Sequence, residues 1–270
     1  MARIVIDDPS DPRLDPYRNL RDRVLRQQGG RFIAESDKVV RRLLESPVEV
    51  ESLLLQADRA DAFSPWIDGD RPAYIVSPDV MTRIAGFSIH TGVLAIGLRP
   101  PGASLDQLIE AAGDGPITLL IASQLKEAVN LGSLMRSAAA LGATALLLGP
   151  RCCDPWYRRA IRVSMGAVFR LPVLTSDDLA ADMRRLVERH HVALHAAVLS
   201  DAARPLHAVR TRPPRVGIAL GHEVRGLDAE LVELCQHQLT LPMVNQTDSL
   251  NVAVSGAVLL HHFTRIAGVR

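Results

Sequence analysis

Residues 249–262 read Ser249-Leu-Asn-Val-Ala-Val-Ser-Gly-Ala-Val-Leu-Leu-His-His262, a nearly all-apolar tract with a polar start. They predict a helix from Leu250 to about Ile266, with Ser249 and Asn251 at its entrance. Apolar side chains spread around the whole circumference of this helix, so it must be buried on more than one side. A central position in the core and a subunit interface both explain such burial, and the polar entrance indicates a functional site.

From Pro116 onward, short apolar runs alternate with helical patterns. Strands are predicted at Ile117–Ala122, Ala145–Leu148, Leu171–Leu174, Val192–Val198, Val216–Leu220 and Gln238–Leu241, and helices at 131–141 and 177–189. Alternation of this kind predicts an α/β fold, in which a parallel sheet is covered by helices on both faces. Ligands on such sheets bind at the carboxyl ends of the strands.

Two further polar motifs lie at predicted strand ends. The first is Asn130-Leu-Gly-Ser-Leu-Met-Arg136, which opens the helix at 131–141. The second is Leu220-Gly-His-Glu-Val-Arg-Gly-Leu227, which follows the strand at 216–220. Because all three motifs follow strands of one parallel sheet, we expect them to meet at one edge.

In this order and spacing, the three motifs resemble those of the SpoU/TrmH branch of the SPOUT RNA methyltransferases. The resemblance implies a C-terminal trefoil knot, S-adenosylmethionine as cofactor, and methylation of a ribose 2′-hydroxyl in rRNA or tRNA. It also implies a homodimer that pairs through the C-terminal helix. The alternatives are a catalytically silent RNA-binding protein that keeps the fold and a SPOUT relative that methylates bases.

The first hundred residues predict a small mixed α/β domain. Strands are expected at Arg31–Glu35, Val48–Leu55 and Val93–Leu98, with a helix at Asp37–Leu44. The segment from Arg31 to Leu44 is similar to the N-terminal RNA-binding module of SpoU-type enzymes, although Ser36 stands where glycine is common. The Pro-Pro-Gly run at 100–102 ends the last strand. The sequence therefore predicts an RNA-binding domain at 1–100 and a methyltransferase domain at 104–270.

The resemblance assigns residues to a cofactor pocket, which Gly221, Leu241 and Leu250 would line. Backbone groups there would make the polar contacts, and Gly221 would let the backbone approach the cofactor closely. A turn glycine is the simpler interpretation of Gly221.

The resemblance also places Arg136 at the catalytic centre. A guanidinium stays protonated, so we expect Arg136 to bind the phosphate beside the target ribose and to stabilise a developing alkoxide. Glu223 is the only carboxylate of its motif. It is expected to orient the hydroxyl, to accept its proton or to hold Arg136 in place.

Asn130, Ser249 and Asn251 complete the candidate catalytic residues. Asparagine and serine are favoured helix caps, so Asn130 and Ser249 have a purely structural interpretation as N-caps of their helices. Asn251, expected in the first turn of the last helix, has no packing reason to be polar. It therefore ranks above Ser249 as a functional residue.

Composition adds few constraints. The formal net charge is +1, so RNA binding must rest on local clusters, such as six arginines between Arg13 and Arg31 and five between Arg151 and Arg170. The N-terminus lacks a signal peptide pattern and no apolar run is long enough to cross a membrane, which predicts a cytoplasmic protein. Three cysteines give neither a disulfide framework nor zinc-ligand spacing. His191 and His195 lack a third ligand, so no metal is expected.

Overall fold

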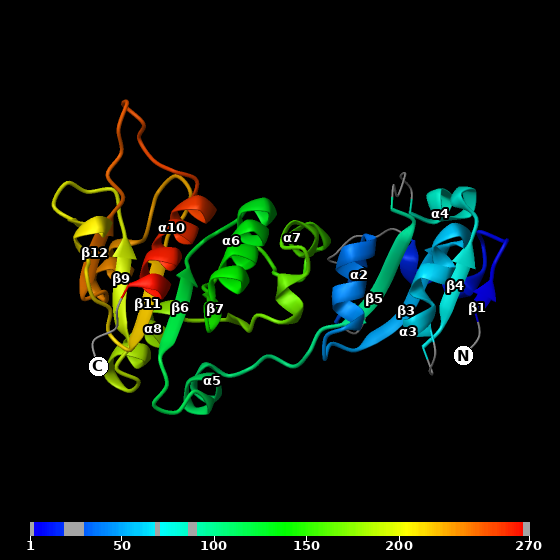
Figure 1. The fold of residues 1–270 in the computed structure, drawn as a ribbon, viewed down its shortest axis with the longest axis horizontal. Helices are drawn as coiled ribbons and strands as arrows, with labels where there is room; N and C mark the ends of the chain where they lie inside the picture. The colour runs from blue at the N-terminus through cyan, green and yellow to red at the C-terminus, as the bar shows by residue number, and fades with distance from the viewer. Residues whose placement is uncertain (1–2, 19–29, 68–70, 86–90, 267–270) are drawn as a thin grey trace. The chain divides into compact units, whose positions relative to one another are not determined.

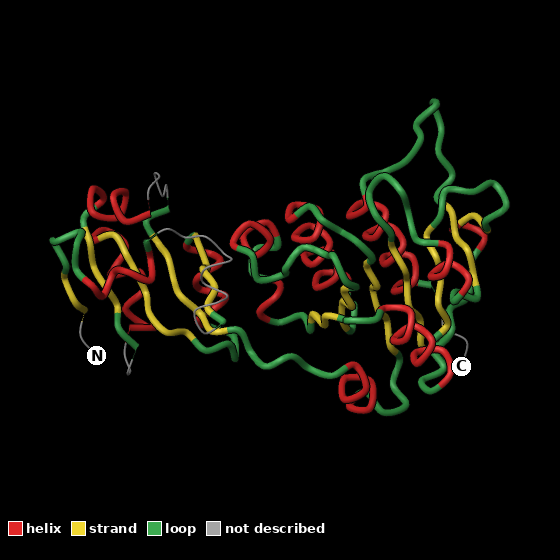
Figure 2. Tube along the Cα trace, turned by 180° about the vertical axis from the view of Figure 1, so that it is seen from behind, coloured by secondary structure: helices red, strands yellow, loops and turns green. Residues whose placement is uncertain are grey.

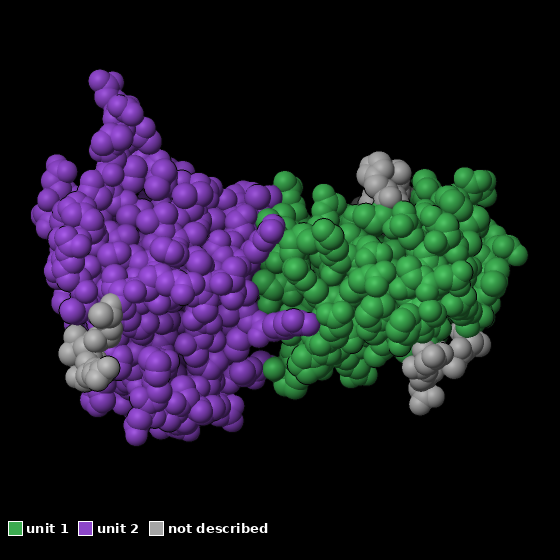
Figure 3. Space-filling view, viewed as in Figure 1, with its two compact units in different colours: residues 1–101, 156–169 green, residues 102–155, 170–270 purple. Residues whose placement is uncertain are grey.

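The computed structural model describes residues 3–18, 30–67, 71–85 and 91–266, and the chain divides into two units (Figure 3). Unit 1 comprises Met1–Pro101 together with Trp156–Phe169. Unit 2 comprises Gly102–Pro155 and Arg170–Arg270. The boundary after Pro101 lies within the predicted Pro-Pro-Gly linker, whereas the inserted segment 156–169 had no signal in the sequence.

Unit 1 is built on a five-stranded mixed sheet with the order β1-β4-β3-β5-β2. The strands are β1 (Arg3–Val5), β2 (Arg31–Glu35), β3 (Val50–Gln56), β4 (Ala73–Val76) and β5 (Val93–Leu98). The helices are η1 (Pro12–Tyr17), α2 (Asp37–Leu44), η2 (Ala57–Phe63), α3 (Ser64–Ile67) and α4 (Pro78–Ala85). The predicted bounds of β2, α2 and β5 are confirmed, and β3 is shifted by two residues at its start and one at its end.

Ser36, between β2 and α2, has a φ of 89°. This is the left-handed region that favours glycine, because a β-carbon there meets the backbone. The family's glycine at this position thus has a conformational reason, and serine adopts the same conformation here.

The segment Trp156–Phe169 contributes α7 (Arg158–Val163) and η3 (Ala167–Phe169) to unit 1. Its aromatic side chains pack on β2: the ring centroids of Phe32 lie 4.8 Å from Trp156 and 5.8 Å from Phe169. Phe32 and Phe169 are buried. This aromatic contact joins residues more than 120 positions apart, so local sequence patterns do not reveal it.

Unit 2 contains a seven-stranded parallel sheet with the order β10-β12-β9-β11-β6-β7-β8 (Figure 1). Its strands are β6 (Ile117–Ala122), β7 (Ala145–Leu148), β8 (Val173–Thr175), β9 (Ala193–Ala197), β10 (Arg204–Pro205), β11 (Arg215–Leu220) and β12 (His237–Thr240). Every residue of β6 and β7 is buried, as expected for strands covered on both faces. The predicted parallel α/β sheet is confirmed.

Helices cover both faces of this sheet (Figures 1 and 2). One face packs against α5 (Leu105–Ala111), α8 (Leu179–Glu188) and α9 (Ala229–Glu233). The other carries α6 (Ala128–Leu141) and α10 (Val252–Arg265), which pack against each other. A short 3-10 helix, η4 (Leu206–Ala208), completes the unit. A β-carbon on Gly256 of α10 would lie 2.6 Å from Leu134 and 2.8 Å from Leu220, so glycine permits this close packing.

The C-terminal helix is buried along one face, whereas its sequence predicts burial on more than one side. Gly256, Leu259, Leu260 and Phe263 face the core of unit 2. Val254 and Val258, one turn apart, are 48% and 42% exposed and form an apolar stripe. Within the described residues, no helix is long and apolar enough to cross a membrane.

Candidate active site

Strands β6 and β11 are neighbours in the sheet, and the segments that follow them carry the first two motifs. Their pairing runs to Leu220 opposite Ala122, so both strands end at the same level. In chain order, β7 and β8 are added on one side of β6, and the later strands β9 and β11 lie on its other side. Such a change of direction in a parallel sheet is the usual position of a ligand site.

A hydrogen-bonded chain of three side chains joins all three motifs. The Asn251 Nδ2 atom donates to Asn130 Oδ1 at 2.9 Å. The Asn130 Nδ2 atom in turn donates to Glu223 Oε1 at 3.1 Å. We call these three residues the polar triad. The structure thus brings together three of the five predicted catalytic residues.

The orientation of both amides in the polar triad follows from their partners. Asn251 Oδ1 accepts a hydrogen bond from the backbone N–H of Ala253 at 2.9 Å, so its Nδ2 must face Asn130. Asn130 then presents Oδ1 to Asn251 and Nδ2 to the carboxylate of Glu223. A backbone donor at one end and a carboxylate acceptor at the other therefore fix which atom donates in each hydrogen bond of the polar triad.

The structural interpretation of Asn130 and Ser249 as helix caps does not agree with the structure. Asn251, rather than Ser249, is the N-cap of α10, and it precedes the first turn instead of lying in it. The N-cap of α6 is Glu127, so Asn130 is the third residue of that helix and does not cap it. The first-turn position frees both ends of the Asn130 amide for the polar triad.

Arg136 lies on the exposed side of α6. It makes no hydrogen bond or ion pair with any residue that the structure describes. The bond that Glu223 makes is to Asn130, which argues against the predicted role of Glu223 in holding Arg136. The guanidinium of Arg136 is available to a ligand.

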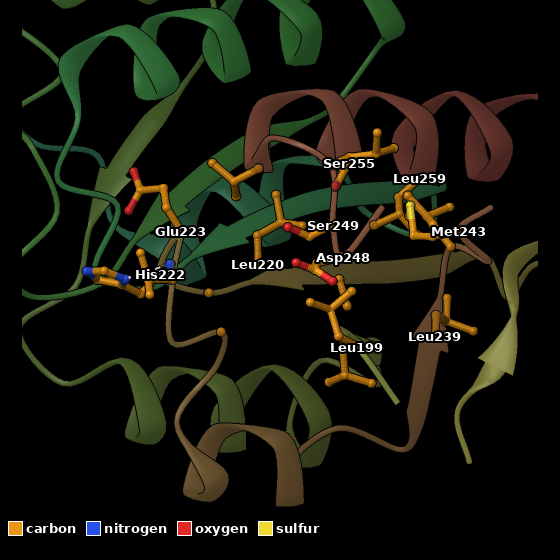
Figure 4. Close-up of a pocket in the computed structure, with 18 residues that line it drawn as sticks. Leu199, Leu220, His222, Glu223, Leu239, Met243, Asp248, Ser249, Ser255 and Leu259 are labelled. Atoms are coloured by element: carbon orange, nitrogen blue, oxygen red, sulfur yellow. Dashed lines mark hydrogen bonds between the residues drawn. The ribbon is translucent and has the colours of Figure 1, made fainter. Parts of the chain in front are cut away.

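A cavity of about 390 Å³ lies beside the polar triad (Figure 4). Its lining includes Gly221, Leu241 and Leu250, the three predicted cofactor residues, together with Glu223 and Ser249. Figure 4 shows Asp248 and Ser249 between the end that holds Glu223 and the end that holds Leu239 and Met243. Further lining residues, which the sequence does not predict, are Ala197, Val198, Leu199, Met243, Asp248 and Ser255. Ala197 is the last residue of β9, and Val198 and Leu199 follow it, so the strand-end rule could have found them.

The geometry at Gly221 supports its interpretation as a turn glycine, and its contact with the cofactor stays a prediction. A β-carbon there would lie 2.1 Å from the carbonyl carbon of Gly226 and 2.2 Å from the backbone nitrogen of Leu227. The loop closes through two backbone hydrogen bonds of 2.9 Å between His222 and Gly226, and Gly226 has a φ of 71°. The loop's own path therefore requires glycine at 221, independently of any ligand.

Gln124, which follows β6, holds the loop that carries Glu223. It is 4% exposed and has a φ of 56°. Its Nε2 donates to Asp228 Oδ2 at 2.6 Å, and its Oε1 accepts from Arg225 Nη2 at 3.0 Å. Asp228 is the N-cap of α9 but makes no side-chain capping bond, because its carboxylate is turned toward Gln124. Gln124 thus bonds to two points of the 221–228 loop.

Burial shifts the pKa of three further titratable groups of unit 2. Burial lowers the pKa of His195 to about 4, with a smaller contribution from the nearby His237. Burial also raises the pKa of the Cys152 thiol and raises that of Cys235 to about 12. Among the described residues, no group of three His, Cys, Asp or Glu side chains could hold a metal ion.

Comparison with known proteins defines the class that this fold and site represent. Residues 118–261 match the SpoU rRNA Methylase family. An uncharacterized tRNA/rRNA methyltransferase of Mycobacterium tuberculosis is 34% identical over 264 residues, which cover 96% of this chain and 90% of the relative. The chain therefore belongs to the SpoU rRNA methylase family, as the three motifs predicted.

Further similarities agree with this family. A 23S rRNA (guanosine-2′-O-)-methyltransferase of Bordetella pertussis is 29% identical, with 84% of this chain and 94% of the relative covered. A crystal structure of an RNA 2′-O ribose methyltransferase is 27% identical with a TM-score of 0.74, over 96% of this chain and 97% of the other. An AdoMet-bound rRNA methyltransferase from Sinorhizobium meliloti has a TM-score of 0.81 at 22% identity, over 96% and 97% of the two chains. This last similarity concerns the fold alone.

Proposed function

We propose that this chain is an S-adenosylmethionine-dependent RNA methyltransferase that methylates a ribose 2′-hydroxyl of rRNA or tRNA. The observation that carries the proposal is the polar triad, which presents a carboxylate to the 390 Å³ cavity at the carboxyl ends of β9, β11 and β12. The names of the Bordetella pertussis relative and of the 27% identical structure support the 2′-hydroxyl as target.

The cavity fits S-adenosylmethionine in size and chemistry. Its volume lies within the roughly 300 to 1,000 Å³ typical of small-molecule sites. We assign Leu241 and Leu250 to the adenine, and the backbone of the 221–226 loop to polar contacts. The Asp248 carboxylate and the Ser249 hydroxyl line the same cavity and suit ribose hydroxyl or ammonium groups. When bound, the cofactor supplies an electrophilic methyl group.

Glu223 is the residue that we assign to the 2′-hydroxyl. Asn130 occupies its Oε1, whereas Oε2 accepts no hydrogen bond from the described residues. Oε2 is therefore the acceptor for the hydroxyl proton, while Asn130 and Asn251 keep the carboxylate from rotating. Arg136 is assigned to the adjacent RNA phosphate, since its guanidinium suits a phosphate and stays charged.

A catalytically silent RNA-binding protein is the second candidate function. All five predicted catalytic residues are present in the chain, and three of them form the polar triad. A protein without catalytic activity would have no need to keep these residues or the hydrogen bonds among them. This favours an active enzyme.

The proposal is tested by incubating the protein with cellular RNA and S-adenosylmethionine labelled in the methyl group. We expect label in RNA, at a nucleotide whose 3′ linkage resists alkaline cleavage because its 2′-hydroxyl is blocked. Label in a linkage that alkali still cleaves would indicate base methylation. Absence of label, with RNA binding retained, would support the silent protein.

We further propose that the protein is a cytoplasmic homodimer paired through α10, with the knotted path of the SPOUT fold. The support for the dimer is the exposed stripe of Val254 and Val258 on α10, whose opposite face packs into unit 2. Val129 on α6 is also 36% exposed and apolar. Obligate dimer interfaces are rich in such apolar surface.

The division of labour between the units is also a proposal. We assign RNA affinity to unit 1 and cofactor binding to unit 2, because the cavity and the polar triad are formed entirely by residues of unit 2. From the sequence, we expect the arginines between Arg13 and Arg31 to contact RNA, and the arginines between Arg151 and Arg170 form a second candidate cluster. The surroundings of these residues in the structure favour the second cluster.

A further inference from the structure

The arginines between Arg13 and Arg31 are neutralised wherever the structure describes them. Arg13 pairs with Asp11 at 2.6 Å and Arg18 with Asp15 at 2.8 Å. Arg31 pairs with Glu51 at 2.7 Å. The other members, Arg21, Arg23 and Arg26, lie outside the described residues. The described part of this cluster thus has little net positive charge.

A second basic cluster forms in unit 1 where α7 packs against β2 and the residues after α7 bond to α2. Glu35, the last residue of β2, lies 3.7 Å from Arg158 and 3.3 Å from Arg162. Arg42 Nη1 on α2 donates to the backbone carbonyl of Met165 at 2.6 Å. These contacts fix α7 beside α2, and Figure 1 shows the two helices next to each other. We call this surface the α2–α7 seam.

Four cations lie on the exposed side of the α2–α7 seam. Lys38 and Arg42 are four residues apart on α2, and Arg159 and Arg162 are three apart on α7, so each pair shares a helix face. All four are exposed; the side chain of Arg162 remains 62% exposed despite its ion pair. Lys38 and Arg159 make no hydrogen bond or ion pair with the residues that the structure describes.

The acidic side chains near the seam do not cancel this charge. Glu35 is buried, 8% exposed, and serves two arginines at once. Asp37 pairs with Arg41 at 2.6 Å. Glu45 is the C-cap of α2 and the one other carboxylate among residues 35–45. The surface therefore has a net positive charge, although the whole chain is close to neutral.

We propose that the α2–α7 seam is the surface by which unit 1 holds the phosphate backbone of the RNA substrate. This inference rests on the proposed RNA methyltransferase function. The four exposed side chains that define the seam are all cations, and Phe32 and Phe169 are buried beneath it. It therefore contributes affinity that is independent of base sequence, since phosphate contacts position an RNA and base contacts specify it. Two segments about 120 residues apart build it, one of them inserted between β7 and β8.

The test uses the full-length protein with the double substitution Lys38→Glu and Arg159→Glu, which leaves the contacts of Arg42 and Arg162 intact. The control is Arg59→Glu with Arg83→Glu, an equal charge change on η2 and α4 of the same unit. Each protein is titrated with cellular RNA at several salt concentrations. S-adenosylmethionine binding and thermal unfolding are measured in parallel.

We expect the seam variant to bind RNA about tenfold or more weakly at about 0.1 M salt. Its slope of log affinity against log salt should fall by about 0.7 to 0.9 for each phosphate that the protein no longer neutralises. The KM for RNA should rise while kcat at saturating RNA, cofactor affinity and the unfolding midpoint stay near wild type. Unchanged RNA affinity, or an equal loss in the control, would refute the seam as an RNA-binding surface without contradicting the proposed methyltransferase function. A wild-type protein that binds RNA at the seam but transfers no methyl group would refute the proposed methyltransferase function and support the seam as an RNA-binding surface.

Discussion

Asn251 donates its amide hydrogen to Asn130 across 2.9 Å, which links two residues that are 121 positions apart in the chain. Each is held by a second bond, Asn251 by the backbone of Ala253 and Asn130 by Glu223. The first turn of α6 and the N-cap of α10 thereby fix the rotamer of a carboxylate in a third segment. This explains why the three motifs have asparagine, asparagine and glutamate at these positions.

The first prediction separates the roles of Glu223. Glu223→Gln keeps an oxygen for Asn130 but removes the negative charge that draws the hydroxyl proton. We expect kcat to fall about 100-fold or more, since general-base contributions are typically 10²- to 10⁴-fold. S-adenosylmethionine affinity, measured by calorimetry, should change little. Near-normal turnover of the glutamine variant would show that Glu223 only positions Asn130.

The second prediction concerns Arg136. Arg136→Ala should abolish methyl transfer and leave cofactor binding nearly intact, because its guanidinium contacts no described residue of the protein. Arg136→Lys should also be severely impaired, since a lysine cannot reproduce the bidentate guanidinium fork. Single-turnover transfer with saturating cofactor measures both. A lysine variant with wild-type rate would refute bidentate phosphate binding.

Much of the fold could be predicted from the sequence, because buried strands appear in it as short runs of apolar residues. The bounds of β2, α2, β5, β6 and β7 agree with those expected. Strands β1 and β4 were missed: β1 has three residues, none of them buried, and β4 has four. Such short segments carry no reliable period.

The candidate site could be predicted only in part. Motifs identified Asn130, Glu223 and Asn251, but not the hydrogen bonds among them, because pairing across 93 and 121 residues leaves no local signal. Helix caps were misassigned since Ser249 and Asn251 are both good capping residues, and only backbone geometry separates them. Asp248 was missed because the irregular segment before α10 has no periodicity.

The third prediction tests Gln124 as a positioning residue. Gln124→Glu keeps the acceptor for Arg225 but sets a carboxylate against Asp228, so the loop that carries Glu223 should move and kcat should fall at least about tenfold. Asp228→Asn in the same chain restores a donor–acceptor pair, because asparagine can donate to the new carboxylate. We expect the double variant to regain most of the lost kcat.

Steady-state kinetics and cofactor calorimetry on the two single variants and the double variant give the coupling between Gln124 and Asp228. Additive losses would contradict the proposed bond as a determinant of loop position. An unchanged kcat in Gln124→Glu would do so as well.

The fourth prediction concerns the dimer. Val258→Asp introduces a charge into the apolar stripe of α10 and should yield a monomer that has lost activity. Val258 is suitable because it is 42% exposed, whereas Leu259 is 1% exposed and its replacement by aspartate would disrupt the core. Val5→Asp, at a position 68% exposed in unit 1, is the matched control. Light scattering measures the molar mass, and a monomeric wild-type protein at micromolar concentration would refute the dimer.

The fifth prediction is a pH dependence of stability from His195. This ring is 4% exposed and packs against Phe263 and His237, with centroid distances of 4.7 and 4.8 Å. Burial lowers its pKa from 6.5 to about 4, so between these values the unfolded chain binds a proton that the folded chain does not. By linkage, the free energy of unfolding falls as the pH drops through this window, by about 3 kcal/mol in total. Above pH 6.5 both states are neutral and the contribution vanishes.

Urea unfolding of the wild-type protein and of His195→Leu between pH 4 and pH 7.5 measures this contribution. The leucine variant lacks the titrating ring, and its carboxylates titrate as in the wild type, so the difference between the two curves isolates His195. We expect the wild type to lose stability relative to the variant by up to about 1.4 kcal/mol per pH unit below pH 6.5, since one proton is taken up. Parallel curves would show that His195 carries the same charge in the folded and unfolded chains.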